Sequence, residues 1–89
     1  MDDVEAYLKE SLRYDPAFAQ AHYQLGVLLE KQQKPSEAIQ ELNQAAALDR
    51  AYPEPHYALA RIYRKTGERE KSDQSLATFL KLKNEKEKK

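Results

Sequence analysis

The sequence HYQLGVLL at residues 22–29 is followed 34 residues later by HYALARIY at residues 56–63. The Leu25-Gly26 step of the first segment and the Leu59-Ala60 step of the second stand in the same helical register. A fixed period of about 34 residues indicates helix-turn-helix units that cannot bury their apolar faces alone and must stack on one another. The repeat therefore predicts a scaffold that presents a surface.

Apolar periodicity around these segments predicts five amphipathic helices joined by short connections. We expect them at residues 3–14, about 19–32, 35 to 49–50, 53–66 and about 69–82. Pro16 marks the end of the first helix, while Pro35, Pro53 and Pro55 fit first-turn positions of later helices. Residues 84–89 have no apolar side chain to bury and are expected to fray.

The 89 residues form one domain with a small core, so its stability depends on close helix packing. Apolar side chains expected in this core recur at every third or fourth position of the predicted helices. They are Val4, Leu8, Leu12, Ala21, Leu25, Leu28, Leu29, Ala38, Leu42, Ala45, Leu48, Leu59, Ile62, Tyr63, Leu76, Phe79 and Leu80.

The composition is typical of a soluble helical protein, with 40% apolar and 34% charged residues. The lack of cysteine excludes disulfides and cysteine-based zinc sites. No stretch approaches the roughly 20 apolar residues of a membrane span, and the N-terminus has no secretory signal pattern. We expect no membrane insertion and favour a cytoplasmic location. The net charge of zero conceals an asymmetry, because residues 1–49 carry nine acidic and four basic side chains.

The repeated positions resemble the tetratricopeptide repeat family, whose pattern combines a Leu-Gly pair, aromatic positions, small residues and a closing proline. Val4, Leu8, Ser11 and Asp15-Pro16 match the second helix of a unit that precedes the two full ones. The full units match at His22, Leu25, Gly26, Leu29, Ala38, Leu42, Ala45, His56, Leu59, Ala60, Tyr63, Gly67, Ser72, Leu76 and Phe79.

This resemblance implies an all-α, right-handed solenoid of about five antiparallel helices. Gly26 and Ala38 are small where the two helices of a unit approach closely, and Ala60 and Ser72 have the same explanation. We expect one domain at residues 1–84, divided into a half repeat at 1–16 and repeats at 19–52 and 53–84, with a charged flexible tail at 85–89.

The chain departs from the family pattern at His22 and His56, which replace a tryptophan, and at Arg50 and Asn84, which replace the closing proline. Two histidines one repeat apart invite a metal-site interpretation, but packed, hydrogen-bonded histidines are favoured. No catalytic constellation or phosphate-binding motif is present. We therefore expect neither enzymatic activity nor a metal or cofactor.

The resemblance places a ligand groove on the inner face of the first helix of each unit, which predicts a protein or peptide partner. Tyr23 and Tyr57 are equivalent anchors, and Arg61, Arg64 and Lys65 would attract acidic sequence unless they form only a solvated face. The lysine and asparagine clamp with which some family members bind chaperone tails is not matched. The expected groove residues are Gln20, Tyr23, Gln24, Val27, Lys31, Glu54, Tyr57, Ala58, Arg61, Arg64 and Lys65.

Self-assembly is the alternative function, because both ends of the array lack the helix that would cover them. Tyr7 and Tyr14 at the front, with Phe79 and Leu80 at the back, are the expected contacts in a homo-oligomer. Phe79 occupies a position where the family normally has alanine. Nucleic acid is a weaker possibility, since the basic set is small and the chain is neutral overall.

Overall fold

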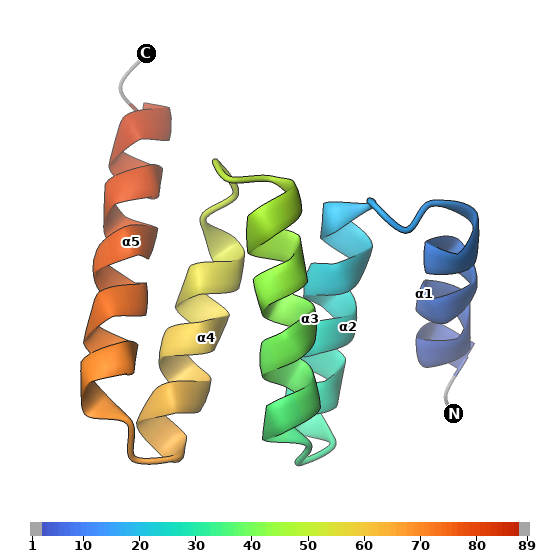
Figure 1. The fold of residues 1–89 in the computed structure, drawn as a ribbon, viewed down its shortest axis with the longest axis horizontal. Helices are drawn as coiled ribbons and strands as arrows, with labels where there is room; N and C mark the ends of the chain where they lie inside the picture. The colour runs from blue at the N-terminus through green and yellow to red at the C-terminus, as the bar shows by residue number, and fades with distance from the viewer. Residues whose placement is uncertain (1–2, 88–89) are drawn as a thin grey trace.

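The computed structural model describes residues 3–87, which form five α-helices and no strand. The helices are α1 (Asp3–Tyr14), α2 (Ala19–Lys31), α3 (Pro35–Leu48), α4 (Glu54–Lys65) and α5 (Arg69–Glu87). They stand side by side in one slab of 34 × 34 × 17 Å, with α1 at one end and α5 at the other (Figure 1). The most extensive packing is between α2 and α3 and between α4 and α5, so the predicted helical hairpins are confirmed.

The 34-residue offset is visible in the turns between helices. Before α2, the backbone N–H of Ala17 donates to Asp15 Oδ1 at 3.2 Å, and before α4, Ala51 donates to Asp49 Oδ1 at 3.2 Å. These side-chain bonds stabilise the same turn twice, as aspartate commonly does. The same side-chain hydrogen bond therefore precedes the first helix of each full repeat.

The turn inside each unit also repeats. Gln33 follows α2 with φ 66°, and Gly67 follows α4 with φ 86°. In both turns the next residue donates its N–H five residues back, from Lys34 to Leu29 and from Glu68 to Tyr63. This is the Schellman arrangement, which normally places glycine at the left-handed position. The first unit holds a glutamine in a backbone conformation that suits glycine.

The core runs along the interior faces of α1 to α4. Gly26 allows α2 and α3 to approach, since a Cβ at this position would lie 2.7 Å from Leu42 Cγ and 3.2 Å from the Ala38 carbonyl oxygen. The predicted small-residue contact is thus confirmed. The buried apolar side chains are Leu8, Ala21, Leu25, Leu29, Ala38, Leu42, Ala45, Ala58, Leu59, Ala60 and Ile62.

Four side chains predicted for the core are exposed, so the expectation was wrong for them. Val4 at the front is 63% exposed, and Leu76 and Leu80 at the back are 39% and 55% exposed. Leu48, at the end of α3, is 42% exposed. No residue of α5 is buried, so the last helix is held by one partly covered face.

The last helix is also longer than predicted. It continues to Glu87, beyond the expected end near Leu82, and Lys83 Nζ lies 3.2 Å from Glu87 Oε2 one turn later. No glycine or proline interrupts this stretch, and lysine and glutamate favour helix even where nothing is buried. Residues 85–87 of the predicted tail are therefore helical, and residues 88–89 lie outside the described part of the chain.

Candidate functional site

The first part of the predicted groove is an apolar hollow between α1 and α2. It has a volume of about 260 Å³. Val4 and Leu8 of α1 form one wall, and Leu28 lies on the other. The remaining lining is formed by four predicted groove residues, Tyr23, Gln24, Val27 and Lys31. An apolar hollow with a lysine in its lining fits an apolar side chain that neighbours an acidic group.

The second part is a smaller hollow between α4 and α5, of about 200 Å³. Tyr57, Arg61 and Arg64 of the predicted groove line it, with Ala60, Ser72 and Leu76 completing the walls. The Tyr57 ring lies 5.1 Å from the Phe79 ring, and the Arg61 guanidinium lies 5.8 Å from the Tyr57 ring centre. Tyr57 is therefore contacted from two sides, by an aromatic ring and by a guanidinium group.

The basic residues predicted for the groove differ in their partners. Arg61 donates from Nη2 to Glu30 Oε1 at 2.7 Å and from Nε to Glu30 Oε2 at 2.9 Å, and Lys65 Nζ lies 3.3 Å from Oε2. The hydrogen bonds from Arg61 hold the pKa of Glu30 below its ordinary value. Arg61 and Lys65 thus join α4 to α2. Only Arg64 of the three makes no ion pair within residues 3–87.

Tyr52 is a residue of this face that the sequence analysis did not identify. Its ring meets the ring of Tyr23 edge to face, with the centres 5.5 Å apart. Burial, with a contribution from Tyr23, raises the pKa of Tyr52 to about 12, and burial also raises the pKa of Tyr23. The sequence does contain a signal for Tyr52, because it lies 34 residues after Phe18, in the equivalent connection of the next repeat.

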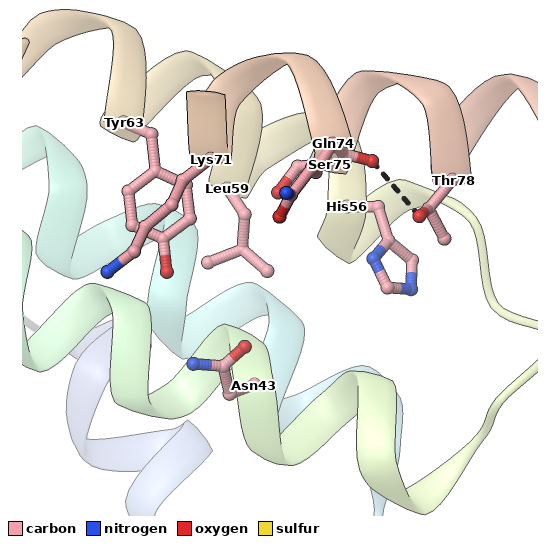
Figure 2. A pocket seen from close by; sticks show the side chains of 8 residues that line it. All are labelled: Asn43, His56, Leu59, Tyr63, Lys71, Gln74, Ser75 and Thr78. Carbon is pink, nitrogen blue, oxygen red and sulfur yellow. Dashed lines mark hydrogen bonds between the residues drawn. The ribbon is translucent and has the colours of Figure 1, made fainter. Parts of the chain in front are cut away.

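The two histidines differ in their surroundings. His22 lies 2.7 Å through Nδ1 from Glu41 Oε1 and 2.8 Å through Nε2 from the Pro16 carbonyl oxygen, which confirms the expected hydrogen-bonded packing. His56 has no side-chain hydrogen bond to any residue within 3–87, so the expectation was wrong for the second unit. Figure 2 shows its ring projecting from α4 into an open pocket.

The remaining predicted residues lie outside the two hollows. Gln20 and Glu54 are exposed near the N-termini of α2 and α4, and Ala58 is buried at 1% exposure and faces the core. Among the residues expected to mediate assembly, Tyr7 is 70% and Tyr14 83% exposed. Leu80 is also exposed, whereas Phe79 is half-buried against Tyr57.

None of the helices in residues 3–87 has the length and apolar character needed to traverse a bilayer. Across the same residues, the His, Asp and Glu side chains form no group of three or more suited to hold a metal ion. The polar and charged groups of interest are therefore those of the two hollows, the ion pairs of Arg61 and Lys65 with Glu30, and the pocket at His56.

Comparison with solved structures finds the same arrangement of helices in MamA proteins. One MamA crystal structure superposes with a TM-score of 0.91 over 96% of this chain and 50% of its own, at 16% identity. The MamA structures titled MSR-1 and AMB-1 superpose with TM-scores of 0.82 and 0.77, at 23% and 24% identity, over 89% and 84% of this chain and 45% and 44% of theirs. The chain thus spans about half the length of these relatives.

No curated protein sequence matches the chain. The sequence model described as "Tetratricopeptide repeat" matches twice, over residues 1–62 and 29–85. The two overlapping matches follow the repeat that the turns and helices show. The fold is one that typically serves as a protein-interaction scaffold and not as an enzyme. The chain belongs to the tetratricopeptide repeat family.

Proposed function

We propose that this module binds a segment of a partner protein along the face formed by α2 and α4. The observation that carries the proposal is the pair of hollows, because seven predicted groove residues line them on equivalent helices. Tyr23, Gln24, Val27 and Lys31 line one, and Tyr57, Arg61 and Arg64 line the other. Hollows that accept apolar side chains, with polar groups at their edges, are the usual form of a peptide site.

The partner segment is an extended or helical peptide with an apolar side chain and an acidic residue. The apolar side chain enters the hollow between α1 and α2, where Val4 is 63% exposed and Val27 forms part of the lining. The acidic residue meets Arg64, since Arg61 and Lys65 are paired with Glu30. Arginine favours carboxylates because its planar fork can donate two hydrogen bonds.

Selection from a random peptide display library tests this proposal. The wild-type protein should enrich peptides that combine an apolar residue with acidic residues. Val27→Asp should lose the apolar preference, because it places a charge in the hollow, and Arg64→Glu should lose the acidic preference. Failure to enrich any motif with the wild-type protein would contradict the proposal.

Arg13→Glu is the matched control for Arg64→Glu. Arg13 is exposed on α1, where its Nη1 lies 3.4 Å from Glu10 Oε1. It lines neither hollow. The same charge reversal at this position should leave the enriched motif unchanged. An equal loss in both variants would indicate a general effect of net charge. The helicity of each variant must match the wild-type protein by circular dichroism.

Self-assembly through the two ends is a second proposal, favoured by the apolar side chains left exposed there. Val4, Tyr7 and Tyr14 are exposed on α1, and Leu76 and Leu80 are exposed on α5. The first 49 residues carry an excess of acidic side chains and the remainder an equal excess of basic ones, so contacts from front to back are electrostatically favourable. The occupant of each end in this proposal is a second copy of the chain.

Light scattering across a range of concentrations tests the second proposal. The wild-type protein should exceed the monomer mass of 10.3 kDa at high concentration. Leu80→Asp should restore the monomer, because Leu80 is exposed and does not line the peptide hollows. Phe79→Asp is a poorer test, since Phe79 also supports Tyr57. A constant monomer mass for the wild-type protein would contradict this proposal and leave peptide binding unaffected.

A further inference from the structure

The pocket at His56 follows from a difference between the two repeats. His22 and His56 are equivalent positions, and the residue equivalent to Glu41 is Ser75. In the first unit, Glu41 fills the space beside the histidine and accepts from its Nδ1 at 2.7 Å. In the second unit, the side chain of Ser75 ends one atom beyond Cβ, so the space of a carboxylate is left open.

The open space is a surface pocket of about 320 Å³ lined by residues of three helices. Asn43 comes from α3 and His56 from α4, while Ser75 and Thr78 come from α5 (Figure 2). Leu59 also lines the pocket and is buried, so part of the lining is apolar. Residues 56, 59 and 63 of α4 line the pocket. They lie on a different face of this helix from Tyr57 and Arg61.

The groups around the pocket suit a carboxylate. The His56 ring and the Asn43 amide can each donate a hydrogen bond to it, and Ser75 adds a hydroxyl. Lys71 lies at the far end, where its Nζ is 5.6 Å from the Tyr63 ring centre, but it is paired with Glu68 Oε1 at 3.2 Å, so the neutral donors carry the recognition. Thr78 donates to the Gln74 carbonyl oxygen at 3.0 Å and is committed to its own helix.

We propose that this pocket binds a carboxylate group that takes the place held by the Glu41 side chain in the first repeat. The carboxylate pairs with His56, as Glu41 pairs with His22, and accepts further hydrogen bonds from Asn43 and Ser75. An aspartate or glutamate side chain of a partner protein and a free small carboxylate both supply this chemistry. The site shares no lining residue with the two peptide hollows.

The charges that face His56 determine how the site responds to pH. Among the lining residues, Tyr63 on α4 and Lys71 on α5 are the other titratable groups, and α3 contributes only the neutral Asn43. Burial lowers the pKa of His56, so the empty pocket holds a neutral ring at neutral pH. A bound carboxylate favours the protonated ring, so binding should strengthen as the pH falls through 6.5, the ordinary value for histidine, toward the lowered pKa of His56 in the empty pocket.

Histidine ring resonances measured by NMR provide the test, with His22 as the internal control. Acetate and a short glutamate-containing peptide should each shift the His56 resonances saturably and raise its pKa, while those of His22 stay unchanged. A peptide that binds about tenfold or more tightly than acetate indicates a protein side chain as the natural ligand. Equal binding of the two indicates a small carboxylate. No saturable shift with either probe would overturn the proposal.

Ser75→Glu is the decisive variant because it restores the glutamate of the first repeat. It should raise the pKa of His56 without any ligand and weaken acetate binding about tenfold or more. His56→Gln keeps a polar side chain of similar size and provides a second variant if Ser75→Glu disturbs the fold. It should abolish the saturable chemical shift changes at the Asn43 amide. An unchanged His56 pKa in Ser75→Glu, or unchanged acetate binding in His56→Gln, would overturn the proposal.

Discussion

Arg61 donates hydrogen bonds to both carboxylate oxygens of Glu30, 31 residues away, the shortest at 2.7 Å from Nη2 to Oε1 and 2.9 Å from Nε to Oε2. The carboxylate that receives them is 9% exposed, whereas the arginine is 39% exposed. The pair joins the first helices of two successive repeats. It also neutralises the charge of Arg61 in the predicted groove. Its two roles can be separated by mutation.

Glu30→Gln should lower the free energy of unfolding by about 1–2 kcal/mol, because a charge-assisted pair becomes a weaker neutral one. The same change releases Arg61 and Lys65, so an acidic peptide should bind more tightly. Urea unfolding and peptide titration measure the two effects. In a double-mutant cycle with Arg61→Gln, additive losses of stability would show that the pair contributes nothing.

The stability that Glu30 provides should depend on pH. Hydrogen bonding by Arg61 lowers the pKa of Glu30 below its ordinary 4.5, so the folded state binds its proton less readily than the unfolded state does. The stabilising contribution is therefore complete above about 4.5 and is lost as the pH falls through the folded-state pKa. In urea unfolding measured from neutral to acidic pH, the Glu30→Gln variant should lose less of its free energy of unfolding than the wild-type protein. Parallel curves for the two proteins would contradict this assignment.

Gly26→Ala should destabilise the fold by about 1–3 kcal/mol, because the added Cβ would lie 2.7 Å from Leu42 Cγ. The higher helix propensity of alanine, worth up to about 1 kcal/mol, offsets part of this cost. Thermal unfolding measures the change. In a Leu42→Ala background the same substitution should cost less, since the Leu42 atoms are gone and only the Ala38 carbonyl oxygen at 3.2 Å remains close. An equal loss of stability in both backgrounds would show that the contact with Leu42 is not the cause.

Gln33→Gly should stabilise the protein by about 0.5–1 kcal/mol, because glycine adopts the observed φ of 66° without strain. For a domain of this size, that gain raises the Tm by roughly 2–8 °C. Gly67→Ala is the reverse experiment: a Cβ there meets no atom within 4 Å, so any loss of stability isolates the backbone effect. If neither substitution changes the stability, the left-handed backbone conformation has no measurable cost at these two positions.

Features that depend on the repeat itself were predictable from the sequence. The period fixed the helical hairpins, and the small residues at positions 26 and 38 indicated the close approach that Leu42 now demonstrates. Both are local consequences of pattern and size. Seven of the groove residues that the family resemblance implied line the two hollows, whereas Ala58, the equivalent of Gln24, is buried in the core.

Features that depend on pairing between distant side chains were not predictable. A row of basic residues on α4 is compatible with ligand binding or with internal ion pairs, and only the position of Glu30 distinguishes them. Equivalent histidines were expected to behave alike, but their partners at positions 41 and 75 differ. The extent of α5 was underestimated because helix propensity alone sustains it, without a buried face.

The lack of any buried residue in α5 has a consequence for the dynamics of both candidate sites. Helices with few buried contacts open at lower free energy than the rest of a fold, so the amides of α5 should exchange with solvent before those of α2 and α3. Ser72 and Leu76 line the second peptide hollow, and Ser75 and Thr78 line the pocket at His56. A ligand at either site would therefore slow amide exchange throughout one shared helix, which couples two surfaces that never touch.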